Sequence, residues 1–224
     1  MLTSNLWDLN KQGTMILANS RYGSHFVAKV IEHLLKNQHT VTRYGEVSLA
    51  DESFSGIEAE MSGLENQPGY KIAIINDQLP KALVIAKPQL LDNWHVVRIM
   101  HNNKLRWFLS YWFFLMSRSP GADHHNTKQQ VYLDQINAQQ PVELSVWQIK
   151  MLCSTLNQTI INQQISCDFQ LEFDDLADYA VGSDVAWLGN EYPNMQLSEL
   201  FTNSEVIEQL LTNWPKEIPS AIRE

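Results

Sequence analysis

Residues 20–25, with the sequence Ser-Arg-Tyr-Gly-Ser-His, bring together residue types that bind an anion. Gly23 allows the backbone to approach a ligand closely, Ser24 adds a hydroxyl donor, and Arg21 adds a permanent cation. A helix that begins after this loop would add unpaired N–H groups and the positive end of its dipole. The glycines and the Lys-Ser/Thr ending of a Walker A loop are missing. Two interpretations remain open: an anion-binding loop, or an ordinary strand-to-helix turn that a serine caps.

The elements on either side of this loop follow from hydrophobic spacing. Residues 15–18 (Met-Ile-Leu-Ala) form a short apolar run that is typical of a buried strand. Apolar residues then recur at helical spacing from 26 to 35, and Ser24 is the predicted N-cap. The start of the chain is therefore predicted to form a strand, a loop and a helix.

Further strands and helices alternate along the chain. We expect strands at residues 70–76, 95–100 and 167–173, and helices at about 102–117, 144–163 and 203–214. Residues 79–91 are ambiguous, because Val84 and Ile85 favour a strand while the spacing suits a helix broken near Pro88. The alternation predicts an α/β fold, with residues 1–224 as one domain and a mainly parallel sheet flanked by helices.

Residues 101–110 (His-Asn-Asn-Lys-Leu-Arg-Trp-Phe-Leu-Ser) are a second segment with chemical potential, between a predicted strand and a predicted helix. Here the sequence resembles bacterial sulfotransferases of the nodulation, trehalose and lipopolysaccharide type. Those enzymes have an Arg-Ser-Gly-Ser loop after the first strand. A later strand ends in Arg-x-Asn, before a helix with Leu-Arg-x-x-x-Ser. Their spacing is kept by Asn103, Leu105, Arg106 and Ser110.

Two further stretches resemble the family in the same chain order. Residues 44–46 (Tyr-Gly-Glu) resemble its Gly-Glu motif soon after the first helix, and residues 173–176 (Phe-Asp-Asp-Leu) resemble its Tyr-Glu-Asp-Leu after a late strand. The resemblance covers about residues 15–211 in separate islands. It implies a P-loop nucleotide-hydrolase-like sulfotransferase fold.

The resemblance also implies an activity and its ligand. Members of the family move a sulfuryl group from 3′-phosphoadenosine 5′-phosphosulfate (PAPS) to a hydroxyl acceptor, here expected to be a carbohydrate or another small molecule. By this resemblance the 5′-phosphosulfate is held by Arg21, Tyr22, Gly23, Ser24 and His25. The 3′-phosphate is held by Arg106 and Ser110, with His101 in the place of the family's arginine.

Glu46 and His25 are the candidate catalytic residues. Sulfuryl transfer resembles phosphoryl transfer, an in-line attack in which positioning and charge neutralisation matter most. The acceptor hydroxyl must still lose a proton, and Glu46, which matches a family glutamate, is the candidate base. His25 would stabilise the leaving phosphate or the sulfuryl oxygens. The alternatives are a solvated loop glutamate and a histidine that only packs or faces solvent.

The chain departs from the family at two positions of the site. His101 replaces an arginine and is only partly charged at neutral pH, and Tyr22 stands where a small serine is usual. These departures favour a second hypothesis, a degenerate member of the same fold that binds a nucleotide or a sulfated ligand without turnover. A P-loop kinase with a divergent loop is a third hypothesis, and the missing lysine disfavours it.

Composition excludes several other classes. The net charge of -9, from sixteen basic and twenty-five acidic residues, argues against non-specific nucleic-acid binding. The N-terminus does not resemble a secretory signal, and the apolar run at 107–116 is too short for a membrane span. Cys153 and Cys167 lack metal or redox spacing, so a cytoplasmic protein with reduced thiols is expected. His124 and His125 lack a third spaced ligand, so no metal is expected.

Overall fold

The computed structural model describes residues 7–8, 10–19, 22–37, 39–47, 53–116, 141–154, 161–176 and 196–213, with backbone alone at 78 and 113–116. The chain divides into two compact units. The first unit contains Met1–Asn102 and Gln158–Gly189, and the second contains Asn103–Asn157 and Asn190–Glu224. Each unit is described below by itself.

The first unit is built on a five-stranded sheet in which every strand pair is parallel. The strands are β1 (Gly13–Leu17), β2 (Val41–Glu46), β3 (Tyr70–Ile75), β4 (Trp94–Met100) and β5 (Phe169–Glu172). Their order across the sheet is β2-β3-β1-β4-β5. This confirms the predicted α/β class and the parallel sheet.

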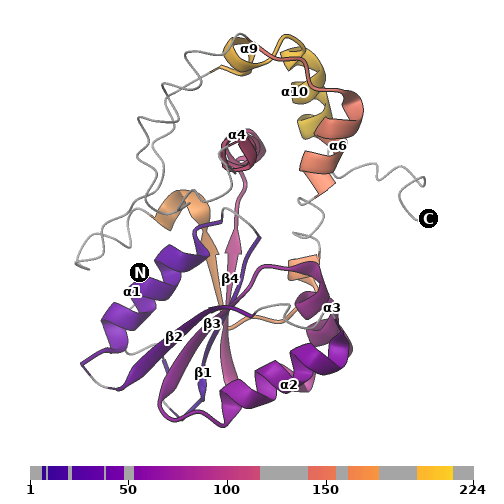
Figure 1. Cartoon of the computed structure of the whole chain (residues 1–224). Helices are drawn as coiled ribbons and strands as arrows, with labels where there is room; N and C mark the ends of the chain where they lie inside the picture. Colours follow the sequence, from indigo (N-terminus) through magenta and orange to yellow (C-terminus); the bar gives the residue numbers. More distant parts are fainter. Residues whose placement is uncertain are drawn as a thin grey trace. The chain divides into compact units, whose positions relative to one another are not determined.

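Helices cover both faces of this sheet. They are α1 (Ser24–Leu35), α2 (Phe54–Glu65) and α3 (Gln78–Ala86). Figure 1 shows α1 on one face of the sheet and α2 with α3 on the other. The chain therefore leaves β1 toward one face and leaves the neighbouring β3 toward the opposite face. Such a divergence is a topological switch point, where open α/β sheets bind their ligands outside the carboxyl ends of the strands.

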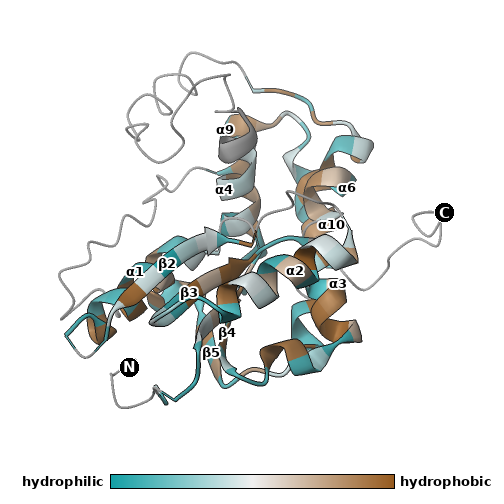
Figure 2. Ribbon diagram, turned by 60° about the horizontal axis from the view of Figure 1, so that its bottom comes forward, coloured by the Kyte–Doolittle hydropathy of each residue, from teal (hydrophilic) through white to brown (hydrophobic). Residues whose placement is uncertain are grey.

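Burial in the core explains why the strands β1 and β3 were predictable from the sequence and the edge strand β2 was not. Every residue of β1 and of β3 is buried, and residues such as Met15 and Ile75 belong to a cluster that includes Ile57 of α2. In β2, by contrast, most positions are exposed or half-buried. Figure 2 shows the contrast as a brown β3 beside a paler and more hydrophilic β2. A parallel strand that is buried on both faces has a nearly continuous apolar sequence, whereas an edge strand does not.

The helical alternative is the correct one for the ambiguous segment at 79–91. Residues Gln78–Ala86 form α3, and Pro88–Leu91 form the short 3-10 helix η2, so the break falls near Pro88 as the helical interpretation predicts. The predicted N-cap of the first helix is wrong by one residue. Gly23 is the N-cap of α1, with a φ of 75°, and Ser24 is the first helical residue. The left-handed conformation that this turn requires favours glycine over serine.

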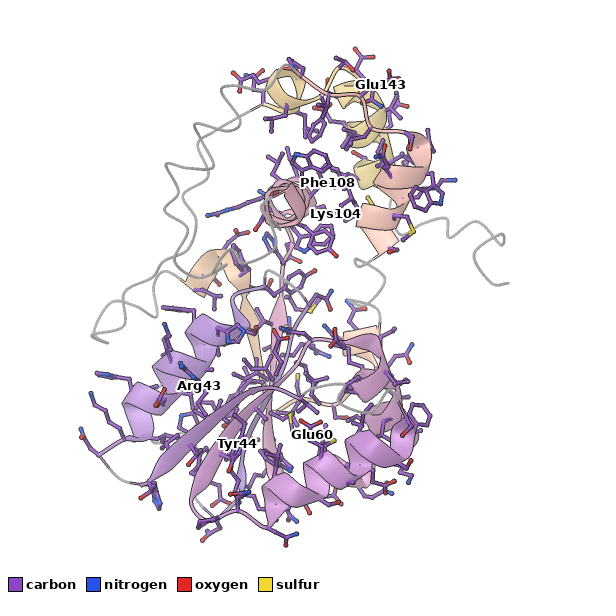
Figure 3. All side chains as sticks on the ribbon, in the orientation of Figure 1. Arg43, Tyr44, Glu60, Lys104, Phe108 and Glu143 are labelled. Carbon is purple, nitrogen blue, oxygen red and sulfur yellow. The ribbon has the colours of Figure 1, made fainter. Side chains whose placement is uncertain are left out.

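The second unit is helical in its described part. It contains α4 (Lys104–Met116), α6 (Val146–Ser154), α9 (Leu197–Leu200) and α10 (Ser204–Asn213). Figure 3 labels Lys104 and Phe108 on α4. Lys104 Nζ donates to the carbonyl oxygen of Leu211 at 3.4 Å, and the Phe108 ring lies edge-on to Phe201 at 6.1 Å.

Some predictions fall on residues that the structure does not describe. The helix predicted at 144–163 is described as α6 up to Ser154, and 155–160 lie outside the described residues. His124 and His125 also lie outside them. Among the helices that are described, none has the length and apolar character needed to cross a bilayer.

Candidate functional site

The candidate site lies at the carboxyl edge of the sheet, beside the topological switch point. Since all strands are parallel, the residues that follow them gather at this one edge. Glu46 is the last residue of β2, Asn76 follows β3, and Asn19 lies just beyond β1. The register agrees, because Glu46 lies opposite Ile74 and Leu17 lies opposite Ile75.

The two candidate catalytic residues are in contact here. His25 Nε2 lies 3.3 Å from Glu46 Oε1. The same carboxylate oxygen accepts a hydrogen bond from Asn76 Nδ2 at 2.6 Å. The side chains of His25 and Glu46 are 45% and 46% exposed, so a ligand can reach the pair from solvent. Asn76 is only 7% exposed, and it therefore anchors the pair from the protein side.

This arrangement suits proton transfer. A neutral imidazole that donates from Nε2 to a carboxylate carries its acceptor lone pair on Nδ1. Glu46 thus orients His25, while Asn76 orients Glu46, as in sites where a base is held by a third group. Either the carboxylate or the imidazole can accept a proton from a hydroxyl group bound beside it.

The start of α1 has a glycine N-cap, which agrees with either interpretation of the loop, an anion site or an ordinary turn. Gly23 adopts a φ of 75° at the N-cap, and its carbonyl oxygen accepts the N–H of Val27 at 3.1 Å. The N–H groups of the first turn of a helix, and the positive end of its dipole, point toward the residues that precede the helix. Ser24 is buried in this turn. Arg21, the predicted cation, lies outside the described residues.

The predicted phosphate ligands Tyr22 and His101 are packed together inside the first unit. Tyr22 is fully buried, and its ring lies 5.4 Å from that of His101 at an interplanar angle of 60°. His101 is 5% exposed and stacks on Phe173 at 4.1 Å and 9°. In this packing the His101 imidazole is almost completely covered.

Arg106 and Ser110, the other predicted ligands of the 3′-phosphate, lie on α4 in the second unit. The N–H of Arg106 donates to Asn103 Oδ1 at 2.9 Å, so Asn103 caps this helix. Ser110 is buried. The asparagine that matched the family motif therefore has a structural role in this chain.

Sequence reasoning missed a buried polar cluster next to the His25–Glu46 pair. Its centre is Lys81 on α3, which is 0% exposed. Lys81 Nζ donates to Ala18 O at 2.6 Å, to Asn19 Oδ1 at 2.9 Å and to Asn76 O at 2.7 Å. Asn162 Nδ2 also donates to Asn19 Oδ1, at 3.1 Å. A signal was present: the polar pair at 76–77 directly follows an apolar strand, and Lys81 is three residues from a buried valine on the same helix face.

The charges of this cluster influence one another. Burial lowers the pKa of Lys81 to about 7, and the nearby Asp77 carboxylate opposes this change. Partial burial and the neighbouring Glu46 raise the pKa of Asp77, while Lys81 counteracts that rise. Two carboxylates, those of Glu46 and Asp77, therefore interact here with each other, and that of Asp77 also interacts with the buried cation.

Within the described ranges, no three His, Cys, Asp or Glu side chains are arranged to hold a metal ion. Comparisons with protein-family models, with curated proteins and with solved structures find no match for this chain.

Proposed function

We propose that this chain is a sulfotransferase, which binds 3′-phosphoadenosine 5′-phosphosulfate and transfers its sulfuryl group to a hydroxyl acceptor, a carbohydrate or another small molecule. The observation that carries the proposal is the 3.3 Å contact between His25 and Glu46. It supports the proposal because a candidate base is joined there to the first turn of α1, whose start suits an anion.

The backbone around Gly23 fits the phosphosulfate end of such a donor. Gly23 is the N-cap of α1, and Ser24 and His25 follow it in the first turn. Arg21 would add a permanent cation. The position of this turn at the topological switch point gives independent support, since ligands of parallel α/β sheets bind there.

The chain's own residues can perform the proton transfer. When bound, the donor would supply the sulfuryl group: the acceptor oxygen would bond to its sulfur, the bond from sulfur to the 5′-phosphate oxygen would break, and adenosine 3′,5′-bisphosphate would leave. The acceptor hydroxyl loses its proton to Glu46, or to His25 Nδ1 while Glu46 holds the ring by Nε2. Asn76 keeps the carboxylate in place through the 2.6 Å hydrogen bond to Oε1. In the first case His25 would instead stabilise the sulfuryl or phosphate oxygens as a donor.

A specific observation favours the second candidate function, a binder of nucleotides or sulfated ligands without turnover. His101 stands where the resembling family has an arginine, and its ring is buried against Phe173 and Tyr22. A buried and stacked imidazole gives weaker support for a 3′-phosphate contact than an accessible arginine would. Binding and transfer must therefore be measured separately.

Binding is tested by thermal melting with adenosine 3′,5′-bisphosphate, with ATP and AMP as matched controls. A ligand that binds only the folded protein stabilises it by about 2.7 kcal/mol at a hundred times its Kd. We expect the bisphosphate to raise the Tm more than ATP or AMP does at equal concentration. A bisphosphate that leaves the Tm unchanged at saturating concentrations would contradict both the enzyme and the nucleotide binder.

Transfer is tested with sulfur-labelled donor and a pool of hydroxyl acceptors, in the wild type and in Glu46→Gln. The variant should keep bisphosphate affinity and slow transfer by about 10²–10⁴, the usual contribution of a positioned base. Glu60→Gln on α2 is the matched control, because it makes the same chemical change away from the strand ends (Figure 3). Equal transfer by wild type and Glu46→Gln would reject Glu46 as the base, and His25→Gln would then be the decisive variant. Bisphosphate binding without any transfer would favour the binder.

A further inference from the structure

Lys81 is buried in a place where burial needs compensation. Lysine is almost never fully buried unless it is paired, because removing its charge from water costs several kcal/mol. Lys81 is 0% exposed and lies near the start of α3, the helix that follows β3. Its contacts must therefore offset that cost, and they show what the side chain does.

Those contacts join two neighbouring strands. Lys81 Nζ binds Ala18 O and Asn19 Oδ1 at the end of β1, at 2.6 and 2.9 Å, and Asn76 O at the end of β3, at 2.7 Å. Three acceptors require three N–H donors, which only the ammonium form of lysine has. The protonated side chain is thus the form that joins both strand ends at the switch point.

Asn76 connects this cation to the exposed pair. Its carbonyl oxygen accepts from Lys81, while its side-chain amide donates to Glu46 Oε1 at 2.6 Å. Glu46 Oε1 is in turn 3.3 Å from His25 Nε2. A continuous chain of contacts therefore runs from the buried ammonium group through Asn76 to the two candidate catalytic residues.

We propose that Lys81 is a positioning residue, whose ammonium group fixes the ends of β1 and β3 and so holds the Asn76 amide where it orients Glu46 beside His25. The proposal rests on the proposed function only in treating His25 and Glu46 as the reacting pair. It implies that the orientation of Asn76 depends on the proton carried by Lys81.

The charged groups around Lys81 come from three elements. Asp77 precedes α3 and is the carboxylate that favours the ammonium form, Glu46 at the end of β2 acts on Asp77, and His25 on α1 contacts Glu46. Burial outweighs Asp77 and lowers the pKa of Lys81 to about 7. Above that pH a neutral amine keeps two donors for three acceptors, so the connection between the strands weakens.

The test is an NMR pH titration of the whole chain, without any ligand. It follows the Lys81 Cε signal and the Asn76 side-chain amide, which is identified by its loss in Asn76→Ala. In the wild type both signals should change with one midpoint. Above that midpoint, Asn76 amide exchange with solvent should become about tenfold faster, as expected when a hydrogen bond of typical strength is lost.

Lys81→Met tests the same coupling at low pH, and Lys71→Met is its matched control. Lys71 is another buried lysine, 4% exposed, but it lies near the amino end of β3, away from Asn76 at the carboxyl end. It donates to Glu65 O at 3.3 Å. Lys81→Met should give the fast-exchanging Asn76 amide at every pH, and Lys71→Met should leave the wild-type titration unchanged.

Three results would overturn the proposal. These are a Lys81 signal that titrates while the Asn76 amide stays constant, an Asn76 amide that changes above neutral pH while Lys81 keeps its proton, and a folded Lys81→Met protein with a native Asn76 amide. The wild-type titration decides the matter even if Lys81→Met fails to fold. No nucleotide or acceptor takes part, so failure of the sulfotransferase proposal would leave this test valid.

Discussion

The unfolding free energy of this protein should depend on pH through Lys81, with a sign that follows from its burial. The folded chain lowers the pKa of Lys81 from 10.5 to about 7, whereas the unfolded chain restores the ordinary value. Between these two values the unfolded chain binds more protons than the folded chain, so the unfolding free energy rises with pH. Below about pH 7 the folded protein bears the part of the cost of a buried charge that the contacts of Lys81 do not offset.

The magnitude follows from the same two pKa values. Inside this window each pH unit changes the stability by about 1.4 kcal/mol for one proton. Raising the pH from about 7.5 to about 9.5 should therefore add about 2 to 3 kcal/mol through Lys81 alone. In Lys81→Met this contribution is absent. The unfolding free energy of the wild type minus that of the variant should therefore rise by that amount between the two pH values.

The assay is urea unfolding at several pH values across this window, for wild type and Lys81→Met in the same buffers. Taking the difference between the two proteins removes the titration of groups that they share and that Lys81 does not influence. A difference that stays constant with pH would refute the reasoning, because it would mean that Lys81 keeps its proton throughout. If the unfolding free energy of the wild type minus that of the variant falls with rising pH, the contacts of Lys81 must raise its pKa by more than burial lowers it.

Two further predictions concern the sheet and the N-terminal segment. Gly13→Ala should lower the unfolding free energy by more than about 2 kcal/mol, because an added Cβ would collide with the Lys71 carbonyl oxygen and the Trp94 ring. Urea unfolding measures this change, and an unchanged midpoint would contradict the packing around Gly13. Burial and the nearby Lys11 lower the pKa of His95, and this effect outweighs that of the nearby carboxylates. The unfolding free energy should therefore fall as the pH drops below about 6.5. His95→Gln should lose less stability than the wild type over that range, and equal losses would contradict the lowered pKa of His95.

The sequence alone was sufficient for the buried strands. The apolar runs at 15–18, 70–76 and 95–100 correspond to β1, β3 and β4, because strands covered on both faces exclude polar residues almost entirely. The helix at 24–35 was predictable for a related reason, since its apolar residues repeat at the spacing of one buried helix face.

The edge strand β2 and the helix α2 could not be predicted in this way. β2 has the sequence Val-Thr-Arg-Tyr-Gly-Glu, and as an edge strand it is half exposed, so its composition resembles that of a loop. In α2 the apolar face consists of Ile57, Met61 and Leu64 among serines and glycines, and the periodic signal is weak. Glycine and serine are poor helix formers, and here tertiary packing outweighs local propensity.

His25 and Glu46 could be singled out from their chemistry and from the family resemblance, but their contact could not. Glu46 ends β2, whereas His25 lies on α1 after β1, and the order β2-β3-β1 places β3 between these two strands. Only the parallel sheet brings the ends of these strands to one edge. There Asn76, from the strand in the middle, reaches the carboxylate.

Lys81 marks what only the tertiary structure decided. In the sequence it is a lysine in a nine-residue helix, and lysine side chains are mostly exposed. Its partners Ala18, Asn19 and Asn76 come from the ends of two strands, and no local pattern predicts that three oxygen atoms converge there. Hydrophobic spacing reports which face of an element is buried. The partner of a buried charge depends on contacts between residues far apart in the chain, which exist only once the sheet has formed.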